Sequence, residues 1–233
     1  QFHLIYQELH QFCSVQLGSV YLDVLKDRMY TLGRDSRARR SGQTAMYLVL
    51  EAMVRWMAPI LSFTADEIWQ HMPARGLGSP LFSTWFEGLA PLPDAAAIGP
   101  AQWALLMELR EATMRRLEPM RQSKAIGSGL DAEVDVFLPE AALAQLRDCG
   151  SELRFLLLVS EVRLHAAAAA PPGALEFTTA AGPARIDAAV TSHSKCTRCW
   201  HHRADVGAHA DHPELCGRCV ENVDGEGERR EWF

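Results

Sequence analysis

The first 124 residues carry hydrophobic side chains at the spacing of α-helices. Apolar residues recur three or four positions apart over residues 1–30, 44–58 and 103–124, as on one face of a helix. Gly18 weakens the first segment, and Pro59 ends or kinks the second because it lacks an N–H donor. Thr64 and Glu67 have the spacing of a capping box, which predicts a short helix to about His71. The segment over 103–124 has many arginines, and we expect it to be an exposed amphipathic helix.

The hydrophobic period changes after Gly127. Residues 132–138 alternate between apolar and other side chains, which predicts a half-buried strand. Pro139 is placed to open a helix that Gly150 closes. Residues 153–158 are apolar throughout and fit either a helix or a strand. Further strands are predicted over 162–164, 175–179 and 186–190, with an alanine-rich linker over 166–173. The pattern thus predicts a helical unit over 1–120, followed by a small α/β unit over 121–190.

Two Cys-x-x-Cys pairs stand in the last forty or so residues. Cys196 and Cys199 form the first pair, and Cys216 and Cys219 form the second after sixteen intervening residues. That spacing is typical of a four-thiolate zinc site, in which Zn²⁺ takes four ligands tetrahedrally. Gly217 supplies the permissive backbone that such a turn often needs. Four cysteines close the coordination shell, so residues 191–233 are predicted to be a module with a structural zinc ion.

The alternatives to a four-cysteine zinc site have less support from the sequence. Two disulfides are possible, but adjacent Cys-x-x-Cys pairs without a secretory signal argue against them. Nearby histidines could replace a cysteine ligand, although the cysteines already complete the set: His201, His202, His209 and His212. The remaining two cysteines, Cys13 and Cys149, have apolar neighbours and are expected to be small buried hydrophobes.

Composition narrows the class of protein. The chain of 233 residues is 48% hydrophobic and 22% charged, as in ordinary globular proteins. The sequence contains no run of eighteen apolar residues, so it predicts no membrane-spanning helix. The net charge of −6 argues mildly against a nucleic-acid binder that uses its whole surface but allows local basic patches. The chain opens without methionine or a signal peptide, as if within a helix, so we expect a fragment of a longer protein.

One basic patch is Arg37, Arg39 and Arg40, which lie where a helix is predicted to begin. Most charge runs are simply solvated. The alternative is that their fork-shaped guanidinium groups contact phosphates. The residues alone leave both interpretations open.

Several segments together resemble the C-terminal part of bacterial isoleucyl-tRNA synthetases. The zinc module resembles theirs in Lys195-Cys196-x-Arg198-Cys199-Trp200-x-His202 and in Cys216-Gly217-Arg218-Cys219-x-x-Asn222. The helical part resembles their anticodon-binding bundle in Lys26-Asp27-Arg28, in Ala38-Arg39-Arg40-Ser41, and in residues 54–67. Glu152-Leu153-Arg154-Phe155 resembles the junction segment. The match follows the order of the family over nearly the whole chain and is poorest over 166–190.

The resemblance implies a mainly α fold, with an anticodon-binding helical bundle, a small α/β junction unit and a four-cysteine zinc module. It implies a part of isoleucine–tRNA ligase that binds tRNA and reads its anticodon, with one structural Zn²⁺ per chain. ATP and Mg²⁺ would bind only in the catalytic domain. The family's His-Ile-Gly-His and Lys-Met-Ser-Lys-Ser signatures are absent from this sequence, so the chain alone is expected to be inactive in aminoacylation and in editing. A cytoplasmic monomer that packs against its own catalytic and editing domains is expected.

Physical chemistry favours two residues of the zinc module for anticodon contact. Unpaired bases stack on aromatic rings and guanidinium planes, and Arg198 and Trp200 flank Cys199. The alternative for Trp200 is that its ring packs beneath the zinc turn. Arg37, Arg39 and Arg40 are candidates for contacts with the RNA backbone. The alternative functions are a zinc-containing scaffold for protein partners and the C-terminal part of a DNA glycosylase.

Overall fold

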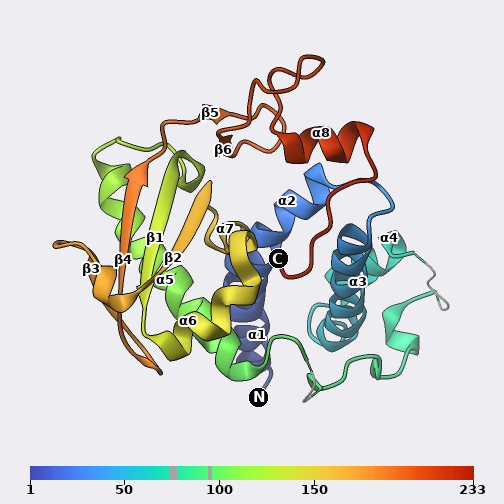
Figure 1. Ribbon diagram of the computed structural model, residues 1–233. Coiled ribbons are helices and arrows are strands. Elements are labelled where there is room, and N and C mark those ends of the chain that lie inside the picture. The colour runs from blue at the N-terminus through green and yellow to red at the C-terminus, as the bar shows by residue number, and fades with distance from the viewer. Residues whose placement is uncertain (74–77, 94–95) are drawn as a thin grey trace. The chain divides into compact units, whose positions relative to one another are not determined.

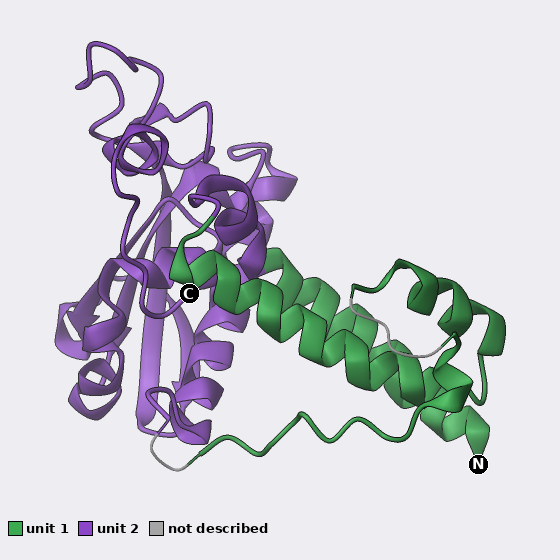
Figure 2. Ribbon diagram, turned by 90° about the vertical axis from the view of Figure 1, so that its right-hand side faces the viewer, with its two compact units in different colours: residues 1–23, 35–93 green, residues 24–34, 94–233 purple. Residues whose placement is uncertain are grey.

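The computed structural model describes residues 1–73, 78–93 and 96–233, which cluster into two compact units (Figure 2). Unit 1 comprises Gln1–Asp23 and Asp35–Pro93, and unit 2 comprises Val24–Arg34 and Asp94–Phe233. Helices dominate the chain, and unit 2 also holds a small mixed sheet and the cysteine-rich module (Figure 1). The predicted fold class is confirmed. The division at residues 120 and 190 stays a prediction.

The first thirty residues are helical, as predicted, but their winding changes along the way. Helix α1 (Phe2–Gln11) passes into a π-helix, η1 (Phe12–Leu22), and then into α2 (Asp23–Thr31). Gly18 suits the π-helix because a Cβ there would lie 3.0 Å from the carbonyl oxygen of Cys13. The residues of η1 are all exposed or half-buried. Cys13 therefore has no core to enter and is exposed, so the prediction that it is buried is wrong.

Two further helices build the core of unit 1. Helix α3 (Arg37–Met57) extends the helix predicted over 44–58, and α4 (Ser62–His71) packs against it. Their buried contacts come from residues three, four or seven apart, as on helix faces: Val54, Ala58, Ala65, Trp69 and Met72. A short 3₁₀ turn, η2 (Pro80–Phe82), follows.

The predicted capping box of α4 is wrong. Helix α4 begins two residues before Thr64, so Thr64 and Glu67 lie inside its first two turns. The Ser62 hydroxyl instead donates to the carbonyl of Ala58 at 2.8 Å. Only residues 58–61 separate α3 from α4. The second helix has therefore already begun where the chain reaches Thr64.

The sheet of unit 2 contains four strands in the order β2-β1-β4-β3. Strand β1 (Ala132–Leu138) pairs in parallel with β2 (Glu161–Ala166) and antiparallel with β4 (Gly182–Val190), and β4 pairs antiparallel with β3 (Leu175–Thr179). All the predicted strands are confirmed. Three short helical segments connect β1 to β2: α6 (Glu140–Leu146), η4 (Arg147–Glu152) and α7 (Leu153–Leu157). The ambiguous apolar run is thus helical, and Leu158 ends it in the left-handed region with φ 56°.

Helix α5 (Pro100–Gln122) is more buried than its sequence indicates. It covers the sheet and shares one hydrophobic core with β1, β4 and α7. Its inward face is almost entirely inaccessible: Leu105, Leu106, Leu109, Ala112 and Leu117. Even Arg110 is buried, and its guanidinium donates to the Leu156 carbonyl. The prediction of an exposed helix is wrong because the basic residues share the helix with a face that packs on the sheet.

The cysteine-rich module ends the chain. Strands β5 (Ser194–Lys195) and β6 (His202–Arg203) form an antiparallel pair, and helix α8 (Gly217–Asp224) follows. Two 3₁₀ turns complete unit 2, η3 (Gly129–Asp131) and η5 (Ala167–Ala169). Among the described residues, no helix combines the length and the apolar character needed to span a membrane.

Candidate zinc centre and its surroundings

Four cysteine sulfurs converge in unit 2. The Sγ atoms of Cys196, Cys199, Cys216 and Cys219 all lie within 4.8 Å of one another. All four residues are buried, with exposed fractions of 7% or less. All are free thiols rather than disulfides. The two Cys-x-x-Cys pairs predicted from spacing therefore form one cluster.

The cluster has the dimensions of a tetrahedral zinc site. Cys199 Sγ and Cys216 Sγ are 3.7 Å apart. Four sulfurs at about 2.3 Å from a central Zn²⁺ would be about 3.8 Å from one another. Four thiolates leave no open position for water or substrate, which is the pattern of structural zinc. The four cysteines thus fit a structural Zn²⁺, which would supply folding energy to the module when bound.

The thiols also need a cation for electrostatic reasons. Hydrogen bonds from Cys199 and Cys219 lower the pKa of Cys216 to about 4, so one thiolate forms readily. The hydrogen bonds that Cys219 makes to Cys199 and Cys216 raise its own pKa far above the ordinary value. Further thiolates in this small buried space repel one another. A divalent cation held by the four sulfurs would remove that repulsion and allow all of them to ionise.

Two backbone turns aim the sulfurs inward. In the first, the N–H of Trp200 donates to the carbonyl of Cys196 at 2.9 Å, and Trp200 adopts a left-handed φ of 66°. In the second, Cys216 is the N-cap of α8, and the N–H of Cys219 donates to its carbonyl at 2.9 Å. Local hydrogen bonds thus place the two sulfurs of each pair on one short turn.

Gly217 is needed for a different reason from the one predicted. Its φ is not in the positive range, so no unusual backbone conformation requires glycine there. A Cβ at this position would lie 2.9 Å from Asp205 Oδ2, which accepts the Gly217 N–H at 2.8 Å. Close approach of this carboxylate therefore favours glycine. The left-handed residue of the first zinc turn is Trp200.

Two of the nearby histidines, His202 and His212, have partners outside the sulfur cluster. His202 contacts the His193 carbonyl through Nδ1 at 2.7 Å, and His212 pairs with Asp224 at 2.6 Å. His201 is buried, with its ring edge-on to the ring of Phe155. These contacts agree with a centre that is made of four cysteines.

Arg198 and Trp200 project from the first zinc turn. Trp200 is 61% exposed, so its ring does not pack beneath the turn. The Lys195 ammonium lies 5.8 Å from the centroid of that ring. Arg198 is exposed overall, but its Nη2 donates to the Thr31 carbonyl at 3.1 Å. The metal turn thus presents an aromatic face with the Lys195 ammonium near it and carries a second cationic side chain, Arg198.

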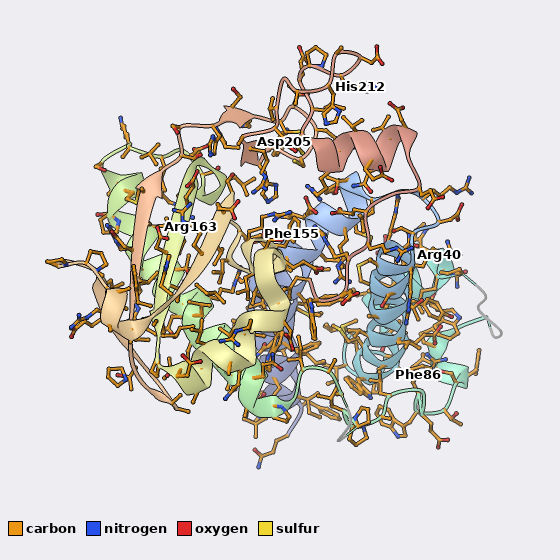
Figure 3. All side chains as sticks on the ribbon, viewed as in Figure 1. Arg40, Phe86, Phe155, Arg163, Asp205 and His212 are labelled. Atoms are coloured by element: carbon orange, nitrogen blue, oxygen red, sulfur yellow. The ribbon has the colours of Figure 1, made fainter. Side chains whose placement is uncertain are left out.

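The other predicted basic residues belong to unit 1. Arg37, Arg39 and Arg40 form the first turn of α3, and Arg40 is labelled in Figure 3. Arg37 and Arg40 are exposed, whereas Arg39 is half-buried. The Ser36 hydroxyl accepts the Arg39 N–H at 3.2 Å and caps the helix. Positive side chains at a helix N-terminus oppose the helix dipole, so they do not serve the stability of α3.

Comparison with known proteins agrees with this geometry. Residues 1–136 match the family model described as the anticodon-binding domain of tRNA ligase. The chain belongs to this anticodon-binding family. Residues 194–222 match a second model, described as a zinc finger found in FPG and IleRS, and this match contains all four cysteines.

Individual relatives resemble the chain along its whole length. It is 54% identical over 231 residues to an isoleucine–tRNA ligase of Thioalkalivibrio sulfidiphilus, covering 99% of this chain and 24% of the relative. It is 53% identical over 233 residues to that of Alkalilimnicola ehrlichii, covering 100% and 25% respectively. The enzyme of Stutzerimonas stutzeri is 49% identical over 232 residues, covering 100% and 24%. The chain spans about a quarter of the length of these relatives.

In this family member, a buried charge cluster joins the zinc module to α2. Arg218 stands between the two cysteines of the second turn and donates to both carboxylate oxygens of Asp27, each at 2.9 Å. Arg230 also pairs with Asp27, and Glu228 accepts from Arg218 at 2.9 Å. The side chains of the four residues are at least 85% buried. Burial alone would raise the pKa of Asp27, but the arginines outweigh it and hold that pKa below the ordinary value.

The ring of Phe155 completes this cluster (Figure 3). The guanidinium carbon of Arg230 lies 3.4 Å from its centroid and that of Arg154 lies 4.4 Å away, which favours cation–π attraction. Glu152 fixes the end of the chain, because its carboxylate accepts the N–H groups of residues 231–233 at 2.9–3.1 Å. Sequence reasoning missed these contacts, although Arg218 inside the second Cys-x-x-Cys pair was a signal that could have indicated them.

Proposed function

We propose that this chain is the tRNA-binding C-terminal part of an isoleucine–tRNA ligase, an enzyme that attaches isoleucine to its tRNA with ATP. The family assignment and the isoleucine–tRNA ligases that match the whole chain support this proposal. ATP and Mg²⁺ act in the catalytic domain, which with the editing domain lies in the three quarters of the relatives that the chain does not span. We also propose that the enzyme acts in the cytoplasm as a monomer.

The exposure of Trp200 on the zinc turn is the observation that supports anticodon reading most directly. A left-handed backbone and two zinc ligands hold this residue, yet 61% of its surface is accessible. Stacking of an unpaired base on such a ring contributes about 1–3 kcal/mol. Lys195 and Arg198 add positive charge beside the ring. We assign Trp200 to base stacking and Arg198 to a contact with the anticodon loop.

Arg37, Arg39 and Arg40 are proposed to contact the RNA backbone. They stand at the N-terminus of a 21-residue helix, where the backbone N–H groups and the helix dipole also attract anions. Guanidinium groups bind phosphates in a bidentate manner. The contribution of these residues should therefore be nearly independent of base sequence and strongly dependent on salt.

Two alternatives have less support. The zinc-finger description names two kinds of protein and does not by itself separate a synthetase from a DNA glycosylase. The anticodon-binding match over residues 1–136 favours the synthetase. A scaffold for protein partners would bind with a shallow salt dependence, whereas phosphate contacts give a steep one.

The test is a titration of the zinc-loaded chain with two anticodon stem-loop RNAs, one with the isoleucine anticodon and one with its bases permuted. We expect preference for the first, and we expect Trp200→Ala to weaken binding of that RNA by about 5- to 150-fold. Bound zinc should be unchanged, because the Trp200 side chain is not a ligand. Equal affinity for both RNAs would limit the chain to backbone contacts, and no binding to either would favour the scaffold.

A further inference from the structure

The last turn of α2 is built into the unit that carries the zinc centre. The chain from Val24 to Arg34 belongs to unit 2, although it is about 160 residues from the first zinc ligand in sequence. Three arginines of the C-terminal module hold this segment. Arg198 donates to the Thr31 carbonyl at 3.1 Å. Arg218 and Arg230 both bind Asp27. The position of the turn is therefore set by contacts on two of its residues.

Between these two anchors stands an exposed aromatic ring. Tyr30 is 77% accessible, whereas Thr31 is 3% accessible and the Asp27 side chain 13%. A single exposed aromatic is common on protein surfaces and needs no explanation by itself. The feature that separates Tyr30 from such residues is its neighbour, because the Thr31 carbonyl accepts a hydrogen bond from Arg198 of the first zinc turn. That zinc turn carries the other exposed ring, Trp200.

We propose that Tyr30 is a second stacking residue for single-stranded RNA, on a surface that α2 and the zinc turn form together. This inference rests on the proposed function. Bases in a loop can be splayed out and received by separate aromatic rings, while cationic side chains neutralise the phosphates between them. Each ring has an exposed basic residue near it in the chain, Arg34 for Tyr30 and Lys195 for Trp200. The sequence does not reveal that Tyr30 and Trp200 belong together, because residues 1–120, which include α2, are predicted from sequence to form the helical bundle.

The test compares variants of the zinc-loaded chain by titration with the isoleucine anticodon stem-loop. We expect Tyr30→Ala to weaken binding by about 5- to 150-fold, as the loss of one stacked base predicts. Tyr30→Phe should retain binding because it keeps the aromatic face, and Tyr30→Leu should not. Trp103→Ala is the matched control, since Trp103 is a 44% exposed aromatic on α5 of the same unit. Zinc content and the thermal midpoint should stay unchanged in the Tyr30 variants, because the side chain is mostly in solvent.

The result for Trp200 separates failure of this inference from failure of the proposed function. If Trp200→Ala weakens binding but Tyr30→Ala does not, the role of Tyr30 is overturned and the proposed function stands. If neither variant changes binding, RNA recognition at the zinc module itself is refuted. Binding by Tyr30→Leu as tight as that by Tyr30→Phe would also overturn the inference, because it would show that bulk rather than stacking matters.

Discussion

The charge cluster around Asp27 gives a sharp prediction about stability. Replacing Asp27 by alanine leaves the guanidinium groups of Arg218 and Arg230 buried without their shared carboxylate, and these side chains are only 12% and 1% exposed. Removing one partner of a buried ion pair typically costs about 3–5 kcal/mol. Glu228 still lies 2.9 Å from Arg218 and 4.0 Å from Arg230. It retains part of the compensation, so we expect a loss near the lower limit, about 3 kcal/mol.

The assay is urea unfolding of the zinc-loaded chain, followed by circular dichroism at equal protein and zinc concentrations. A domain of this size should also lose about 6–12 °C in thermal midpoint. The matched control is Glu176→Ala, which removes an ion pair with Arg185 of similar length, 2.6 Å, that is much more exposed. Exposed pairs contribute about 0–1 kcal/mol.

Comparing Asp27→Ala with Glu176→Ala separates the effect of burial from the effect of the N–O distance in the ion pair. If Asp27→Ala destabilises the chain no more than Glu176→Ala does, the reasoning is refuted. A double variant with Arg218→Ala then measures the coupling. Because the two residues share a contact, its cost should differ from the sum of the single variants by about 0.5–3 kcal/mol. Simple additivity would show that the pair does not act as a unit.

Three other predictions follow from the same structure. Chelation of zinc should unfold residues 191–233 first, since metal binding to such modules supplies about 10–16 kcal/mol; unchanged protease resistance of this segment would contradict it. The hydrogen bond from Arg163, labelled in Figure 3, lowers the pKa of Asp135 below its ordinary value. This carboxylate therefore adds stability at pH values above the ordinary pKa, and that stability is lost as the pH falls through the lowered pKa. In zinc-free protein, the urea midpoint of Arg163→Met should therefore decrease less between about pH 5 and about pH 3 than the midpoint of the unsubstituted protein. An equal decrease in both proteins would refute the role assigned to Arg163. Gly129→Ala should cost about 1–3 kcal/mol in urea unfolding, because its Cβ would lie 2.4 Å from the Leu158 carbonyl oxygen; a neutral result would mean that the backbone shifts freely there.

Local patterns in the sequence determined much of the secondary structure and the metal site. Most helices and strands outside the cysteine-rich module follow from hydrophobic periods of about 3.6 and 2, which depend only on neighbouring residues. The four zinc ligands follow from a spacing that places each pair of sulfurs on one short turn. Both kinds of signal lie within a few residues of chain, and the resemblance to a family added the expected function.

Only the tertiary structure decided which faces became buried and which distant residues met. The basic character of α5 predicted exposure, but packing against the sheet buried one of its faces, Arg110 included. Asp27 and Arg218 are 191 positions apart, and no local period or spacing encodes a contact over that distance. The accessibility of Trp200 and Tyr30 was equally undetermined, because exposure depends on what the rest of the fold covers. Local sequence thus specified the four-cysteine cluster and most of the regular elements, while long-range packing determined which aromatic and charged groups remain available for binding.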